Sequence, residues 1–147
     1  MSGSIKLTSG DLELMQMFQQ QSGATARDCI VDTKMDRIIF VVNKGEMGLA
    51  IGRAGQNVKN IQGAVGKPVE LVEFSDDPKE FIKNSLDPKL AGDVRLTERI
   101  DGRKVATVVV DEKKKGALLG RNGRNAERAR LLAKRYFGIS NIHIVHQ

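Results

Sequence analysis

The apolar positions near the start of the chain follow two different periods. Leu12, Met15 and Phe18 recur every three to four residues, which is typical of one face of an amphipathic helix. Two short runs rich in β-branched residues follow at 28–32 and 37–42, and these are typical of strands. The chain therefore opens with a predicted helix and two strands, and the short segment between the strands suits a hairpin.

The pattern then returns to helical spacing before one more strand. A short helix is predicted from about residue 45, and a second helix carries Val58, Ile61 and Val65 on one side. A turn with two glycines lies between these helices, and an apolar strand is predicted at 69–74. The first half thus reads helix, strand, strand, helix, glycine turn, helix, strand.

The second half repeats this order. The segment DPKE from Asp77 combines an N-cap residue, a proline at the first helical position and a glutamate three residues after the cap. An Asp-Gly pair at 101–102, a strong hairpin signal, separates the predicted strands 93–100 and 104–110. A helix, a glycine turn and a helix follow, and the final strand is predicted at 141–146.

The repetition extends to the residues themselves. The segment GLAIGRAGQNVKNI (48–61) returns as GALLGRNGRNAERA (116–129), so that Gly52, Arg53 and Gly55 recur 68 positions later. Matching residues in matching surroundings indicate two copies of one structural unit.

The repeat divides the chain into residues 1–74 and residues 75–147. Each unit has about seventy residues, which is near the lower limit for an independent core. Only Ser75 and Asp76 separate the last predicted strand of the first unit from the predicted cap of the second. Because two residues are too few for a flexible tether, we expect the two units to be rigidly joined.

Composition and charge narrow the class of protein. Of the 147 residues, 40% are hydrophobic and 29% are charged, as in ordinary globular proteins. The formal net charge is +6, and it is unevenly divided. Residues 1–74 hold eight Lys and Arg against eight Asp and Glu, whereas residues 75–147 hold sixteen against ten. This favours a polyanionic partner, attracted mainly by the second unit.

Several features argue against other classes. Cys29 is the only cysteine, which excludes an intrachain disulfide and a cysteine-cluster metal site. No apolar run is long enough for a signal peptide or a membrane span, so we expect a cytoplasmic protein without a membrane partner. The chain lacks the glycine motifs of nucleotide-binding enzymes and any evident nucleophile–base pair. We therefore expect neither an enzyme nor a metal or other cofactor.

A glycine-x-x-glycine turn between two helices, preceded by Ile51 or Leu119, resembles the signature of the KH domain. The element order resembles the prokaryotic type II arrangement. Two such units joined almost directly are similar to the archaeal NusA-like transcription termination/antitermination factors. The resemblance covers nearly the whole chain. It implies an α+β fold of two tandem type II KH domains, each αββααβ, with a three-stranded mixed sheet and helices on one face.

The turns suit contact with nucleic acid. Glycine lacks the Cβ that would keep a phosphate from the backbone, and the helix after each turn offers free N–H groups and a partial positive charge. An arginine inside each turn can pair with phosphate oxygens. The predicted RNA-binding residues are Ile51, Gly52, Arg53, Ala54, Gly55, Gln56, Asn57, Lys59, Lys113, Lys114, Lys115, Leu119, Gly120, Arg121, Asn122, Gly123, Arg124, Asn125 and Arg128.

The resemblance further implies that bases lie in an apolar groove beside each turn. Ile51 and Val58 would line the groove in the first unit, and Leu119 and Ala126 would line it in the second. With no Trp, one Tyr and five Phe, the chain is poorly supplied for an aromatic stacking platform.

The leading hypothesis is a non-catalytic, monomeric factor that clamps single-stranded RNA at nascent transcripts and modulates termination or antitermination. RNA polymerase or the elongation complex would be a further partner. One alternative is an rRNA-binding or ribosome-assembly protein. Another, from a different class, is a protein-interaction scaffold with vestigial RNA binding.

Overall fold

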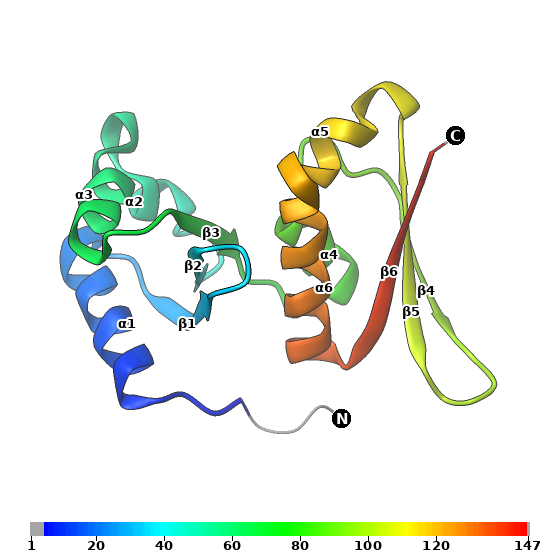
Figure 1. Ribbon diagram of the computed structural model, residues 1–147, viewed down its shortest axis with the longest axis horizontal. Coiled ribbons are helices and arrows are strands. Elements are labelled where there is room, and N and C mark those ends of the chain that lie inside the picture. Colours follow the sequence, from blue (N-terminus) through cyan, green and yellow to red (C-terminus); the bar gives the residue numbers. More distant parts are fainter. Residues whose placement is uncertain (1–4, 147) are drawn as a thin grey trace. The chain divides into compact units, whose positions relative to one another are not determined.

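The computed structural model describes residues 5–146, and its internal contacts divide the chain between Phe74 and Ser75. One compact unit covers Lys6–Phe74, and the other contains the segment from Ser75 onward (Figure 1). Within the described residues, the helices are all too short or too polar to cross a membrane.

The first unit holds one mixed sheet and three helices. The central strand β2 pairs antiparallel with β1 and parallel with β3. The order along the chain matches the sequence prediction, and a 3₁₀ turn at Arg53–Gly55 occupies the glycine turn. The elements are α1 (Ser9–Ser22), β1 (Ala26–Asp32), β2 (Arg37–Val42), α2 (Met47–Ile51), α3 (Gln56–Val65) and β3 (Val69–Glu73).

Local signals at both ends of α1 explain where that helix begins and ends. The hydroxyl of Thr8 accepts a hydrogen bond from the N–H of Asp11, whose carboxylate accepts one from the N–H of Thr8. Gly23 ends the helix in the left-handed region at φ 76°. Between these caps, Phe18 is fully buried, and its ring centroid lies 4.5 Å from that of Phe40 on β2.

The second unit repeats this topology. The central strand β5 pairs antiparallel with β4 and parallel with β6. Figure 1 shows α4 and α6 on one side of this sheet. The elements are α4 (Pro78–Ser85), β4 (Val94–Glu98), β5 (Lys104–Val110), α5 (Lys115–Leu119), α6 (Arg124–Phe137) and β6 (Ile139–His146).

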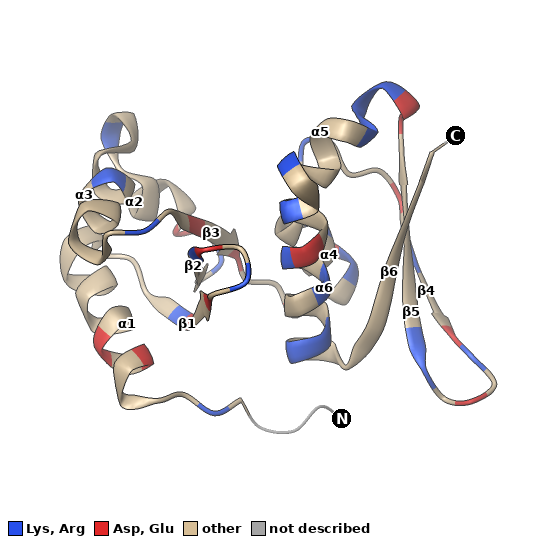
Figure 2. Cartoon of the chain, viewed as in Figure 1, with Lys and Arg blue, Asp and Glu red and all other residues tan. Residues whose placement is uncertain are grey.

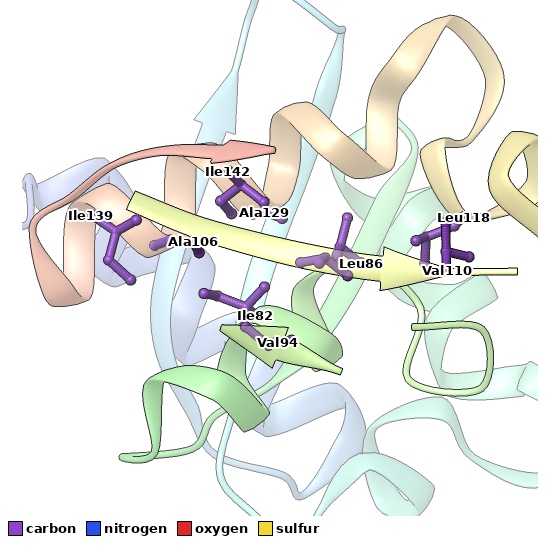
Figure 3. Close-up of a cluster of buried hydrophobic side chains, with 11 residues drawn as sticks. Ile82, Leu86, Val94, Ala106, Val110, Leu118, Ala129, Ile139 and Ile142 are labelled. Atoms are coloured by element: carbon purple, nitrogen blue, oxygen red, sulfur yellow. The ribbon is translucent and has the colours of Figure 1, made fainter. Parts of the chain in front are cut away.

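Alternation along the strands builds the core of the second unit. Val94, Ala106 and Ile142 point from the three strands toward the helices, where they meet Ile82 of α4 and Leu86, which follows this helix (Figure 3). All five are buried. The predicted cap of α4 is confirmed, because the Asp77 carboxylate accepts a hydrogen bond from the N–H of Lys79.

These observations confirm an α+β fold with two three-stranded mixed sheets. Some predicted boundaries were wrong by two residues. The short helix α2 begins at Met47 rather than near residue 45, and β6 begins at Ile139 rather than Asn141. The rigid joining of the two units stays a prediction.

Candidate nucleic-acid interface

The first glycine of each loop needs to be glycine for two separate reasons. Gly52 and Gly120 have φ angles of 77° and 79° with ψ angles of 172° and 168°, a region open in practice only to glycine. A Cβ on Gly52 would also lie 2.9 Å from the backbone nitrogen of Asn57, and one on Gly120 would lie 3.1 Å from that of Asn125. Both loops therefore bring bare main chain against the start of the next helix.

The following residues take the same path in both loops. Ala54 and Asn122 have φ angles of 54° and 58°, and Gly55 and Gly123 have φ angles of 74° and 71°. Two successive left-handed residues thus lead into each helix. Asn tolerates this conformation better than Ala does, so the first loop holds a less suitable residue than the second.

The side chain of Asn57 lies across the base of the first loop. Its Nδ2 donates a hydrogen bond to the backbone oxygen of Leu49 at 2.8 Å, which ties the first turn of α3 to α2. The amide of Asn125 lies in the same place beside Gly120. The sequence predicted both asparagines to be RNA contacts. The structure gives Asn57 a role in holding the loop.

Both helices that follow the loops begin without a capping side chain. Gly55 and Gly123 occupy the N-cap positions of α3 and α6, and neither helix receives a side-chain cap hydrogen bond. The first backbone N–H groups of these helices therefore lack the partner that a Ser, Thr or Asp cap would supply. Such helix N-termini, with their partial positive charge, bind anions.

Basic side chains surround these openings. Arg53 and Arg121 are exposed within the loops, and Lys59 is exposed on the first turns of α3. Gln56, also exposed, donates a hydrogen bond to Asn60. Figure 2 shows basic segments at the start of α5 and along α6 in the second unit.

The lysine run before the second loop lies on a short 3₁₀ turn. Asp111 caps this turn by accepting a hydrogen bond from the N–H of Lys113. Lys113 and Lys114 are exposed, whereas Lys115 is half-buried and begins α5. The run therefore leads directly into α5, the short helix that enters the second loop.

Arg128 is turned away from the loop. Its Nε donates to the backbone oxygen of Ser85, and its Nη2 donates to that of Leu86, both at 2.7 Å. These carbonyls lie at the C-terminal end of α4, so the guanidinium joins α6 to α4. Arg128 was predicted to bind RNA, and we exclude it from the proposed interface because its donors hold a helix end.

The apolar surface beside the loops differs between the units. Ile51 is 40% exposed and Val58 is half-buried in the first unit, whereas Ala126 in the second is only 2% exposed. The prediction that Ala126 lines a groove was therefore wrong, because this residue belongs to the core. Leu49, which the sequence analysis did not single out, is 52% exposed and extends the apolar rim of the first loop. The matching position in the second unit is Ala117. A large apolar residue in one copy and a small one in the other is a difference that a position-by-position comparison of the repeat would have shown.

Between residues 5 and 146, His, Cys, Asp and Glu side chains form no group of three or more that could hold a metal ion.

The chain is similar to several known proteins. A family model described as KH domain matches residues 13–76. The Probable transcription termination protein NusA of Methanococcus vannielii is 37% identical over 141 residues, which is 96% of this chain and 80% of that protein. The protein of the same name from Halobacterium salinarum is 36% identical over 141 residues, covering 96% of this chain and 99% of the relative.

A bacterial relative and a solved structure extend the comparison. The Transcription termination/antitermination protein NusA of Bacillus subtilis is 35% identical over 89 residues, but these make up only 22% of its length. The crystal structure of APE1850 superposes with a TM-score of 0.84 at 38% identity, over 94% of this chain and 99% of that one. With this likeness to archaeal relatives over nearly its whole length, and a KH domain in its first unit, the chain belongs to the archaeal NusA family.

Proposed function

We propose that the protein binds single-stranded RNA through both of its glycine loops, 52–55 and 120–123, and acts as a transcription termination/antitermination factor. The observation that supports this most strongly is the pair of loops itself. They share the same left-handed path, the same glycine whose Cβ would clash, and the same uncapped helix after the loop.

Each loop would grip the sugar–phosphate backbone. A phosphate oxygen placed over the loop accepts hydrogen bonds from the free N–H groups of the helix start, and no Cβ at Gly52 or Gly120 holds it away. The guanidinium of Arg53 or Arg121 then pairs with the remaining oxygens. KH domains clamp about four nucleotides in this way.

Bases would be held by aliphatic side chains rather than by stacking on aromatic rings. Leu49 and Ile51 form an exposed rim beside the first loop. In the second unit, Tyr136 and Phe137 pack edge-on against buried Phe81, at ring distances of 5.1 and 5.8 Å. These rings serve the core. Base selection would therefore depend on the shape and apolar contacts of the groove, most of all in the first unit.

We further propose that the second unit is also a KH domain, so that the chain is a tandem of two type II KH domains covering residues 1–74 and 75–147. The support is the repeated element order and the identical pattern of sheet pairing. The sixteen basic and ten acidic residues after position 74 give the second unit the stronger electrostatic attraction to phosphate.

The place of action would be the nascent transcript. The archaeal relatives are named as probable transcription termination proteins, and the bacterial one as a termination/antitermination protein. We therefore propose a non-catalytic, cytoplasmic factor whose partners are single-stranded RNA and the transcribing polymerase.

Paired Asp substitutions in each loop would test the RNA-binding proposal. In one variant Arg53 and Ala54 become Asp, and in the other Arg121 and Asn122 become Asp. Asp tolerates the left-handed conformation at 54 and 122, so the backbone is kept while each carboxylate repels phosphate. We expect losses of RNA affinity on the order of several kcal/mol at low salt.

A matched control separates charge from conformation. Ala54→Asn suits the same backbone without adding charge, and it should leave RNA affinity intact. Circular dichroism shows that each variant is folded, and fluorescence anisotropy with labelled single-stranded RNA measures binding. Unchanged affinity in both folded Asp variants would remove the loops from the interface and favour the scaffold alternative. Termination efficiency in a reconstituted archaeal transcription reaction then tests the place of action.

A further inference from the structure

The face of the second sheet that points away from α4 and α6 mixes polar side chains with the apolar Val105, Val109 and Val145. Residues on this face alternate with the core residues of each strand, and the register sets them side by side across the three strands. Arg95 pairs with Thr107, which pairs with His143. In the next row, Thr97 pairs with Val105, which pairs with Asn141.

This face contains a hollow of about 280 Å³ near the β4–β5 hairpin. Only Val105 among its lining side chains is apolar, and it is buried. The other lining side chains can all donate hydrogen bonds, and none is a carboxylate. The lining residues are Arg99, Arg103, Val105, Ser140, Asn141 and His143.

The hydrogen bonds that these side chains already make leave donors for a ligand. The Asn141 Oδ1 accepts from the N–H of Ile142 at 2.8 Å, so the amide's remaining polar atom is the donor Nδ2. The Nε of Arg103 donates to Asp101 at 2.7 Å, which fixes this guanidinium at the rim by one edge. Arg99 makes no side-chain ion pair or hydrogen bond with the described residues.

From these groups we infer a second anion site, which binds a phosphate of RNA that lies outside the loop grooves. Two guanidiniums beside one hollow repel each other, and an anion between them removes that repulsion. Asp101 offsets one of the two charges, and the other remains. The mixed set of guanidinium, hydroxyl and amide donors suits the tetrahedral arrangement of phosphate oxygens.

The site is separate from the second glycine loop. A neighbouring hollow that shares Arg103 and Ser140 also touches Phe137 and Gly138, which places both hollows at the C-terminal end of α6. The glycine loop lies at the other end of this helix, whose 14 residues span about 20 Å. An RNA of about four nucleotides fills one loop groove, so only a longer RNA would reach the hollow.

This inference depends on the proposed RNA binding, and two RNA lengths separate the two proposals. An RNA of about four nucleotides fills one loop groove, and a second RNA several times longer extends beyond it. Arg99→Gln removes one charge from the hollow. Asn141→Asp keeps the oxygen that accepts from Ile142 but puts a carboxylate where the amide donor stood. Lys89→Gln, which removes a charge from an exposed position outside the hollow, is the matched control.

We expect Arg99→Gln to weaken binding of the long RNA on the order of tenfold at low salt, the effect of one charge-assisted hydrogen bond. It should also lower the log–log salt slope by about 0.7, the value for one phosphate of a single strand. Asn141→Asp should weaken binding of the long RNA further, and both variants should bind the four-nucleotide RNA normally. The inference would be overturned if Arg99→Gln and Asn141→Asp bound the long RNA as tightly as Lys89→Gln does. An equal loss of affinity for the short RNA would overturn it too. The Asp loop variants, measured with the same short RNA, test the loops independently.

Discussion

The Nδ2 of Asn57 donates a hydrogen bond to the backbone oxygen of Leu49 at 2.8 Å, and the side chain that makes this bond covers Gly52. The bond joins the end of α2 to the first turn of α3. It adds a polar link between two helices whose Ala50 and Ile61 also share the core of the first unit. The loop's shape therefore depends on a side chain that lies outside it.

Asn57→Ala should loosen the first loop. Losing one net hydrogen bond should reduce the free energy of unfolding by about 1 kcal/mol. RNA affinity should fall as well, because the loop would no longer be preorganised. Urea denaturation and RNA anisotropy measure the two effects. Asn60→Ala is the control, since Asn60 only accepts a surface hydrogen bond from Gln56. Wild-type affinity in Asn57→Ala would show that the loop keeps its shape without this bond.

The first glycines of the loops should not tolerate alanine. In Gly52→Ala the new Cβ meets the backbone nitrogen of Asn57, and the φ of 77° adds backbone strain. We expect a loss of roughly 1–3 kcal/mol in stability together with a loss of RNA binding. Gly63→Ala is the control, because Gly63 lies within α3 and a Cβ there meets nothing within 4 Å. That variant should be more stable by up to about 1 kcal/mol. Equal stability of the two variants would contradict the strain argument.

The next left-handed position offers a reciprocal exchange. Ala54→Asn should stabilise the protein by several tenths of a kcal/mol, roughly, because Asn adopts positive φ more readily than Ala. Asn122→Ala should destabilise it by a similar amount. Both effects follow from φ angles of 54° and 58°. Thermal unfolding of the two variants side by side provides the measurement, and shifts of the same sign would contradict this account.

The repeat explains why so much of the fold could be predicted. The order of helices and strands occurs twice, so a weak signal in one copy is supported by the matching element of the other. Caps such as Asp77 and strands such as β2 depend on neighbours in the sequence, which a single sequence displays directly. The interactions that could not be predicted join residues that lie far apart in the sequence. Arg37, fully buried on β2, pairs with Asp32 at 2.8 Å and with Glu70 at 3.0 Å, and Glu70 is 33 residues away.

The candidate site shows the same limit. The glycines and arginines of the loops are local features, and the sequence marks them as candidates. Arg128 has the right charge and lies near the loop in sequence, but its partners in α4 stand more than forty residues earlier. The hollow that we propose as an anion site is lined by residues from β6 and from the β4–β5 hairpin. No spacing in the sequence indicates that these residues lie together.

Arg128→Ala should therefore act on stability rather than on binding. Two carbonyls at the end of α4 would lose a charged donor, and the free energy of unfolding should fall by about 1.5–3 kcal/mol. RNA affinity per folded molecule should stay the same. Arg121→Ala is the contrasting variant. Because Arg121 is exposed in the loop, this variant should lose RNA affinity with little change in stability. An affinity loss in folded Arg128→Ala equal to that in Arg121→Ala would return Arg128 to the interface.

The division of charge predicts unequal salt effects from the two units within the intact chain. Replacing Lys113, Lys114 and Lys115 with Gln should lower the log–log salt slope of RNA binding by about 0.7 for each phosphate that the lysines neutralise. Arg121→Gln should also lower the slope. Arg53→Gln should reduce it less than the second-unit changes together, because the first unit has no excess of positive charge to attract the RNA. Lys34→Gln controls for charge removed from an exposed hairpin of the first unit. A larger change in slope from Arg53→Gln than from the lysine triplet would show that the first unit dominates the electrostatic attraction.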